Sequence, residues 1–224
     1  MPHFYATHRD GDLVEISGPD ARHLAGPLRA RPGHKISVVD PAGYLLTVSL
    51  TTVSGAQVTG SVVESRPHQP EPATLLTMAI AMLPAASLEL VLSRCTELGA
   101  HAFILVQAER SVARGAKHER WATICREAAM LAGRLHIPSV SGPLTTTELV
   151  RTHAPVMLDP RSNARLAQLE LMREDVLAIG PEGGWTPAEI ALSSRTARLG
   201  GTTLRADTAA LTALATALTS RGDL

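Results

Sequence analysis

Two short segments near the C-terminus contain the residue types that a small-molecule site requires. Residues 178–185 read Ala-Ile-Gly-Pro-Glu-Gly-Gly-Trp, and residues 204–209 read Leu-Arg-Ala-Asp-Thr-Ala. Each segment follows an apolar, strand-like run and precedes a helix-like run, and ligands of open α/β proteins bind at that edge of the sheet. Glycine lets the main chain approach a ligand closely because it has no Cβ. We therefore expect a small-molecule site walled by main-chain groups.

Simpler interpretations of both segments stay open, whereas several common sites are excluded. The glycine-rich segment could be a plain turn, and Asp207 could cap a helix, where a carboxylate interacts favourably with backbone donors and the helix dipole. The sequence has no Gly-x-x-x-x-Gly-Lys-Ser/Thr, Gly-x-Gly-x-x-Gly or Gly-x-Ser-x-Gly motif. It also has no His-Glu-x-x-His or Cys-x-x-Cys motif, and its nine histidines are scattered. We therefore expect no metal site.

The composition predicts a folded chain with a buried core. Of the 224 residues, 45% are hydrophobic and 19% are charged, and the formal net charge is zero. That balance argues against a strongly basic nucleic-acid binder, although a local basic patch stays possible. Only two of the 21 basic residues are lysine. Arginine suits bidentate contacts to phosphate, but a coding bias towards arginine explains the same count.

The sequence favours a cytoplasmic location. Cys95 and Cys125 both fall in helix-like runs, which is typical of reduced, buried thiols. Residues 1–5 have no apolar signal core. The apolar run from residue 75 to residue 92 is interrupted by Pro84 and two polar residues. We interpret this run as a strand followed by a helix, and we expect no membrane association.

The first third of the chain has the pattern of a small β-barrel. β-branched runs predict strands at residues 36–39, 45–48 and 57–63, with a hairpin-type turn at residues 40–43. Three prolines between residues 66 and 72 then predict a stiff, extended linker. We divide the chain into a barrel domain, a proline-rich linker and a second domain at residues 1–66, 67–73 and 74–224.

The second domain alternates strands with helices. We expect strands at residues 74–82, 102–106, 155–158, 176–179 and 202–204. We expect helices at residues 87–98, with Ser87 as N-cap and Gly99 as its stop, and at residues 119–131, 162–171 and 208–219. Thr186 and Glu189 form a capping box with proline at the first helical position, which predicts another helix start. This α/β alternation implies a parallel sheet with helices on both faces.

These motifs, in this order, resemble the RsmE family, the uridine-N3 methyltransferases of small-subunit ribosomal RNA in the SPOUT superfamily. The resemblance spans nearly the whole chain and rests on residues 94–99, 109–111, 127–129, 133–134, 180–184 and 204–209. In the N-terminal part, residues 23–24, 28–29 and 33 resemble the family's PUA-like, RNA-binding β-barrel. The Gly-Pro-Glu-Gly-Gly loop and the Leu-Arg-x-acid-Thr-Ala loop are specific only in combination.

The resemblance implies a SPOUT methyltransferase domain with a deep trefoil knot, which is a rare exception to the rule that chains do not thread loops. It implies a homodimer that acts on small-subunit rRNA, in assembled 30S particles. It also implies that S-adenosylmethionine is bound by the loops of the knot. By position, the cofactor-binding residues are Leu158, Asp159, Ile179, Gly180, Pro181, Glu182, Gly183, Gly184, Gly200, Leu204, Ala206, Thr208 and Ala209.

The sequence departs from the family pattern on the expected RNA side. Ala85 and Arg94 each stand where the family commonly has lysine. Residues 131–132 are Leu-Ala where the family has a polar pair, and residues 206–207 are Ala-Asp where it has Thr-Glu. The cofactor loops keep the family pattern, so methyl transfer is expected even though the RNA-side residues differ.

The chemistry of methyl transfer assigns roles to several charged residues. Uracil N3 carries a proton at neutral pH and lies on the pairing edge, so the base must be unpaired and its N3 proton removed. We expect Asp207 to be the base and Arg205 to stabilise negative charge on the uracil oxygens. We expect RNA contacts, with an ordinary solvated surface as the alternative, from Arg22, Arg29, Arg31, Lys35, Arg110 and Arg134.

Two other functions stay open at the level of sequence. The chain could be a SPOUT methyltransferase that acts on another RNA, either tRNA or large-subunit rRNA. It could also be a non-catalytic RNA-binding protein that has kept the fold. The intact glycine-rich loop argues against the second alternative.

Overall fold

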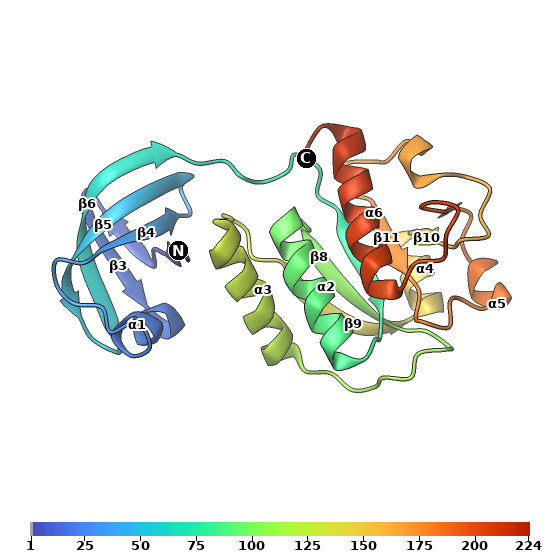
Figure 1. The fold of residues 1–224 in the computed structure, drawn as a ribbon, viewed down its shortest axis with the longest axis horizontal. Helices are drawn as coiled ribbons and strands as arrows, with labels where there is room; N and C mark the ends of the chain where they lie inside the picture. The colour runs from blue at the N-terminus through green and yellow to red at the C-terminus, as the bar shows by residue number, and fades with distance from the viewer. Residues whose placement is uncertain (1) are drawn as a thin grey trace. The chain divides into compact units, whose positions relative to one another are not determined.

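The computed structural model of the protein describes residues 2–224, which form two compact units (Figure 1). Among the described residues, the first unit comprises 2–71 with Ala129–His136, and the second comprises Pro72–Ala128 with Ile137–Leu224. No helix in the described part of the chain has both the length and the apolar character of a membrane span.

The first unit contains a six-stranded sheet in the order β1-β4-β5-β6-β3-β2. The predicted strands are confirmed within β4, β5 and β6, at Lys35–Asp40, Tyr44–Val53 and Gln57–Pro67. The sequence did not reveal β1, β2, β3 or α1, at Phe4–Tyr5, His8–Asp10, Leu13–Ser17 and Gly18–Ala25. All strand pairs are antiparallel except β1 with β4. Phe4, Val14 and Val48 are among the buried residues of this unit's core, which also includes Met130.

The second unit is built on a six-stranded, fully parallel sheet in the order β12-β10-β11-β7-β8-β9. The strands lie at Thr77–Ala81 (β7), Ala102–Gln107 (β8), Ser139–Thr145 (β9), Val156–Leu158 (β10), Val176–Ile179 (β11) and Thr196–Ala197 (β12). The α/β class and the parallel sheet predicted from the alternation of elements are thus confirmed.

Helices cover both faces of this sheet, as expected. Along β7, Met78 and Ile80 face one apolar cluster while Ala79 and Ala81 face the other, because side chains alternate along a strand. The first cluster includes α2, α3 and α6, at Ala85–Leu98, His118–Ala132 and Ala206–Arg221. The second cluster includes Leu149 of α4 and the partly buried Ile190 of α5, in Thr146–His153 and Pro187–Ile190.

Three local predictions need correction. The segment 162–171 is not a helix; only Leu166–Gln168 forms one 3-10 turn (η1). Residues 202–204 form no strand, and the edge strand is β12, because Thr196 and Ala197 pair with β10 instead. Ser87 is not an N-cap, since α2 begins at Ala85 directly after Pro84. Gly99 does end α2, with the left-handed φ of 113° that favours glycine.

The capping box at Thr186 is present, and the described helices include a second, similar box at Thr145. The hydroxyl of Thr186 accepts from the Glu189 N–H at 3.2 Å, and Glu189 accepts from the Thr186 N–H at 2.9 Å. Thr145 and Glu148 form the same pair at the exposed start of α4, at 3.2 Å and 2.8 Å. The local helix-start geometry of the two boxes is therefore the same.

Glu189 differs from Glu148 because it is buried and binds two more segments. Its Oε1 accepts from the Glu109 N–H after β8 at 3.0 Å and from the Thr146 hydroxyl of α4 at 2.6 Å. Burial raises the pKa of Glu189, but the hydrogen bonds from Thr146, Thr186 and Glu109 outweigh it and hold the pKa below its usual value. The charged carboxylate therefore stabilises the folded state.

We expect Glu189→Gln to lower the free energy of unfolding by about 2 kcal/mol at neutral pH, because an amide leaves at least one buried backbone donor unpaired. Glu148→Gln, the matched control on an exposed box, should cost less. Urea unfolding followed by circular dichroism measures both changes.

The same pair tests the pH dependence. Since the folded-state pKa of Glu189 is lowered, its stabilisation is present above the unfolded pKa and is lost as pH falls through the folded value. The difference between wild type and Glu189→Gln should therefore shrink in acid. A difference that stays constant down to low pH would contradict this role.

Candidate active site

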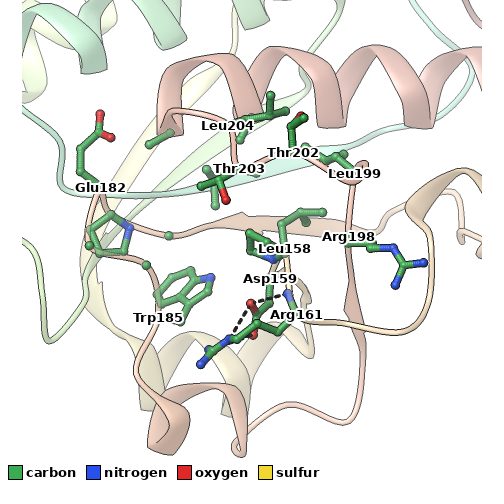
Figure 2. Close-up of a pocket in the computed structure, with 18 of the residues that line it drawn as sticks. Leu158, Asp159, Arg161, Glu182, Trp185, Arg198, Leu199, Thr202, Thr203 and Leu204 are labelled. Atoms are coloured by element: carbon green, nitrogen blue, oxygen red, sulfur yellow. Dashed lines mark hydrogen bonds and ion pairs between the residues drawn. The ribbon is translucent and has the colours of Figure 1, made fainter.

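A pocket of about 400 Å³ lies at the carboxyl ends of β10 and β11 (Figure 2). Its lining comes from the loops that follow these strands, from the loop after β12 and from the first turn of α6. Ligand pockets typically have volumes of about 300–1,000 Å³, so this one can hold a molecule of nucleoside size. Apolar walls from Leu158, Ile179 and Leu204 suit a flat ring.

The structure brings the cofactor-binding candidates together from three separate loops. The pocket is lined by Leu158, Asp159, Ile179, Gly180, Pro181, Glu182, Gly183, Gly184, Gly200, Leu204, Ala206 and Ala209. Thr208 is exposed on α6 and lies outside the lining. The sequence analysis did not identify seven further lining residues. In the sequence, only their position close to the predicted cofactor-binding residues could have indicated them. They are Pro160, Arg161, Trp185, Arg198, Leu199, Thr202 and Thr203.

Two glycines shape the loop that links β11 to α5. The N–H of Gly184 donates to the Pro181 carbonyl at 2.8 Å and closes a turn in which Gly184 has a left-handed φ of 68°. A Cβ on Gly180 would lie 3.1 Å from Nε1 of Trp185, so a larger residue would displace the indole ring. The loop is therefore a specific backbone shape rather than a generic turn.

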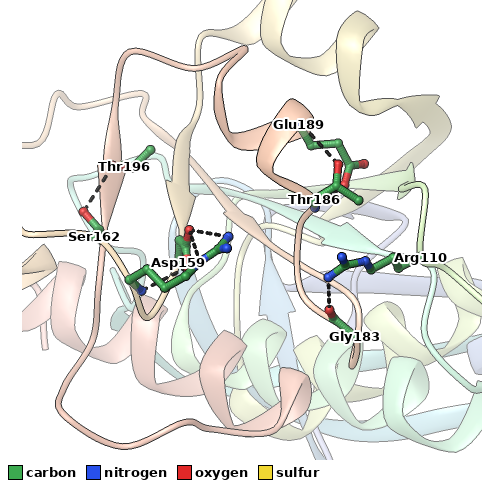
Figure 3. A network of polar contacts seen from close by, with 8 residues as sticks. Arg110, Asp159, Ser162, Gly183, Thr186, Glu189 and Thr196 are labelled. Carbon is green, nitrogen blue, oxygen red and sulfur yellow. Dashed lines mark hydrogen bonds and ion pairs between the residues drawn. The ribbon is translucent and has the colours of Figure 1, made fainter.

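Arg110 connects this loop to the end of β8. Its Nη1 donates to the Gly183 carbonyl at 2.8 Å (Figure 3), and its side chain is exposed at the pocket wall. The neighbouring Glu109 is held through its backbone N–H by Glu189. Arg110, which the sequence predicts to contact RNA, therefore lies at the pocket. The Glu189 carboxylate, which also binds the start of α5, holds the residue beside it.

Asp159 is the buried acid of the pocket lining. Its carboxylate accepts from the backbone N–H of Arg161 at 3.0 Å and from the Arg161 guanidinium at 3.0–3.2 Å. Burial raises the pKa of Asp159, but the bonds from Arg161 outweigh it and keep the pKa below its usual value. Asp159 is therefore charged and already paired, while the Arg161 side chain is largely exposed.

The two candidate catalytic residues lie beside the pocket lining, at the start of α6. Arg205 is the N-cap residue, and its Nη2 lies 3.7 Å from Oδ2 of Asp207. The Asp207 side chain is 14% exposed, whereas that of Arg205 is 72% exposed. Asp207 also accepts from the Thr208 N–H at 2.7 Å. It lies in the first turn of α6 and is not the N-cap, and no side chain caps this helix, so the simpler interpretation of Asp207 as a cap is wrong.

The basic residues expected to contact RNA have different surroundings. In the first unit, Arg22, Arg29, Arg31 and Lys35 are exposed, and no ion pair is found for these four side chains within residues 2–224. The segment that carries Arg29 and Arg31 is fixed by backbone hydrogen bonds, including Arg29 N–H to the Gly26 carbonyl at 3.1 Å. These side chains are therefore available to a ligand.

Arg134 has a different environment from the one expected of an RNA-contacting residue. It is 3% exposed, and its Nε and Nη2 donate to the carboxylate of Glu71. Glu71 also accepts from the backbone N–H groups of Leu135 and His136 at 2.8 and 3.0 Å. Burial raises the pKa of Glu71, but Arg134 and these two hydrogen bonds lower it by more. The net pKa is therefore below its usual value, and the pair is ionised. The guanidinium holds residues 129–136 in the first unit.

Comparison with known families identifies the second unit. The RNA methyltransferase domain family matches residues 69–218. The ribosomal RNA small subunit methyltransferase E of Synechocystis is 34% identical over 218 residues, which cover 90% of this chain and 71% of the relative. That of Mycobacterium bovis is 31% identical over 235 residues, which cover 95% and 89%.

Solved structures of methyltransferases are also similar to this chain. The ribosomal RNA small subunit methyltransferase E of Neisseria gonorrhoeae, bound to S-adenosyl methionine, superposes with a TM-score of 0.86 at 26% identity, covering 98% of this chain and 97% of that one. A Legionella pneumophila methyltransferase in complex with the same cofactor gives 0.86 at 25% identity, covering 98% and 96%. The chain therefore belongs to the RNA methyltransferase domain family and, within it, to the RsmE family of small-subunit ribosomal RNA methyltransferases.

Proposed function

We propose that this protein uses S-adenosylmethionine to methylate N3 of a uridine in 16S ribosomal RNA. One observation carries the proposal: the loops assigned to the cofactor from the sequence line one pocket of suitable volume. Relatives named ribosomal RNA small subunit methyltransferase E, one of them solved with S-adenosyl methionine, support both the cofactor and the RNA substrate.

The residues of the pocket fit the cofactor. The side chains of Leu158, Ile179 and Leu204 offer apolar surface to the adenine ring, and residues 180–184 offer main-chain groups. The buried Nε1 of Trp185 has no hydrogen-bond partner, so the pocket holds an unused donor for a ligand. When bound, S-adenosylmethionine supplies an electrophilic methyl group on its sulfonium.

The charged residues of α6 supply the remaining chemistry in this proposal. Asp207 removes the N3 proton of an unpaired uridine, and N3 then forms its bond to the methyl carbon as the sulfur–carbon bond breaks. Arg205 stabilises the negative charge that develops on the uracil oxygens. The sheltered carboxylate and the exposed guanidinium suit these two roles, because the proton acceptor lies near the pocket and the arginine can reach the RNA.

RNA binding in the proposal uses Arg110 at the pocket and Arg22, Arg29, Arg31 and Lys35 in the first unit. We leave Arg134 out, because its side chain is buried against Glu71. The first unit is proposed to be a PUA-like barrel. Residues 4–10 support it, because they run from the β1 edge of the sheet to the β2 edge. Between these strands, the Ala6 N–H donates to the Val39 carbonyl of β4, and the Thr7 N–H donates to the Glu15 carbonyl of β3.

The wider assignments complete the proposal. They divide the chain into an RNA-binding domain, a linker and a SPOUT methyltransferase domain with a trefoil knot, at residues 1–66, 67–73 and 74–224. They also comprise a homodimer, a cytoplasmic location and assembled 30S particles as the substrate. The strand order β12-β10-β11-β7 supports the knotted domain, because strands that are neighbours in this parallel sheet are not all consecutive in the chain. The structural similarity to the Neisseria gonorrhoeae methyltransferase supports it as well.

The modified nucleoside tests the function directly. We expect mass spectrometry of 16S rRNA to show one methylated uridine that disappears on deletion of the gene and returns with the wild-type copy. Loss of a methyl group from tRNA or large-subunit rRNA instead would assign the enzyme to another RNA. An unchanged set of modifications would contradict catalysis.

The catalytic assignment predicts a separation of binding from turnover. Asp207→Asn should keep the affinity for S-adenosylhomocysteine in calorimetry while kcat falls by about 10²–10⁴-fold, which is the usual contribution of a general base. Asp12→Asn, which changes an exposed acid of the first unit, is the control. Undiminished turnover of Asp207→Asn would remove Asp207 from this role.

The RNA surface predicts a change in salt dependence. Arg29→Gln with Arg31→Gln should weaken RNA binding and lower the slope of log Kd against log salt by about 1.5, because each lost phosphate contact contributes about 0.7–0.9. Arg9→Gln with Arg120→Gln, the control, removes the same charge from arginines already paired with Asp40 and Glu89. Equal slopes for the two double variants would contradict the surface.

A further inference from the structure

Trp185 carries an unsatisfied polar atom at the pocket. The residue is 3% exposed, and its Nε1 has no hydrogen-bond partner. Among the described residues that line the pocket, no other side chain has a buried polar atom in this condition. Buried tryptophan N–H groups usually find an acceptor, so this one requires an explanation.

The packing of the indole ring directs the N–H to the pocket. Trp185 belongs to the apolar cluster on the α4 and α5 face of the sheet, with neighbours such as Val106 and Ala178. Its Nε1 edge lies against Gly180, where a Cβ would come within 3.1 Å. Figure 2 shows the indole nitrogen on the side of the ring that faces Leu158 and the pocket interior.

Within residues 2–224, no acceptor lies within hydrogen-bond distance of this nitrogen. Asp159 is the buried acid of the lining, and both of its oxygens already accept from Arg161. Glu182 is exposed, and in Figure 2 its carboxylate points away from the indole ring. The donor is therefore left for a molecule that enters the pocket.

We propose that Trp185 is a specificity-determining residue whose indole N–H donates a hydrogen bond to the bound methyl donor. The inference rests on the proposed function. An indole N–H is a donor only, so its partner is a lone pair on an oxygen or ring nitrogen and cannot be the ammonium or the sulfonium. The nucleoside and the carboxylate of the amino-acid part both offer such lone pairs.

Calorimetry with S-adenosylhomocysteine tests the bond. Trp185→Phe keeps an aromatic ring and removes the donor, and we expect its Kd to be about tenfold weaker than that of wild type. Trp121→Phe changes the other tryptophan, which is buried in the opposite cluster, and should leave the Kd unchanged. Methylthioadenosine, which lacks the carboxylate, locates the acceptor: a loss with both ligands assigns it to the nucleoside, and a loss with S-adenosylhomocysteine alone assigns it to the carboxylate.

Thermal unfolding separates this role from a structural one. Because the N–H has no partner in the free protein, Trp185→Phe should not lower the Tm of the ligand-free protein through loss of a hydrogen bond. It should reduce the rise in Tm that saturating S-adenosylhomocysteine produces. A variant with a lower ligand-free Tm and a wild-type ligand-induced rise would overturn the proposal.

A measurement on the wild-type protein keeps the test independent of folding of the variant. The chain has two tryptophans, so an ¹⁵N-labelled sample gives two indole N–H signals, which Trp121→Phe assigns. We expect the Trp185 proton signal to move downfield when S-adenosylhomocysteine binds. Binding by wild type with no such shift, or with equal affinity for Trp185→Phe, overturns this inference alone. No binding by wild type overturns the proposed function.

Discussion

The carboxylate of Glu189 holds together the segments that surround the pocket. It accepts hydrogen bonds from the end of β8 at Glu109, from α4 at Thr146 and from the start of α5 at Thr186. The glycine-rich loop lies directly before α5, and Arg110 lies directly after Glu109, so this buried charge is bonded beside two of the segments that line the pocket. Burial raises the pKa of Glu189, and the hydrogen bonds from Thr146, Thr186 and Glu109 outweigh it and lower the pKa below its usual value. The pocket geometry therefore depends on a network of three chain segments rather than on the loop alone.

The site combines a fixed wall with accessible charges. Its lining combines apolar side chains such as Leu158 and Ile179 with polar and charged ones, and its buried acid, Asp159, is paired with Arg161. At Gly180 an added Cβ would lie 3.1 Å from the Trp185 ring, and Gly184 has a left-handed φ of 68°, so these two glycines shape this part of the wall. By contrast, Arg110 and Arg205 are exposed, which suits contacts to a large, charged substrate. The family membership and the pocket thus agree on a small cofactor inside and an RNA outside.

Arg134 shows why residue type and order do not establish a role. Its place after the α3 helix fits an RNA-contacting arginine, and the tertiary structure instead buries it against Glu71. The ion pair and the two backbone bonds to Glu71 hold residues 129–136 in the first unit, although these residues lie far along the chain. A buried guanidinium must be paired, so its charge is used inside the protein.

The sequence alone determined the α/β class, the strands at β4–β6, β8 and β11 and the capping box at Thr186, because these depend on local periodicity and capping chemistry. The expected small-molecule site at residues 178–185 and 204–209 likewise came from the sequence, and most of these residues line the pocket. The sequence misplaced the strand at 202–204, because Thr196 and Ala197 pair with β10 instead, and the helix at 162–171, because Arg165 bridges Arg198 there. Only the tertiary structure decided that Trp185 presents a free N–H, that Asp159 is already paired and that Glu189 joins three segments. Those properties depend on which distant residues meet, and local sequence does not encode that.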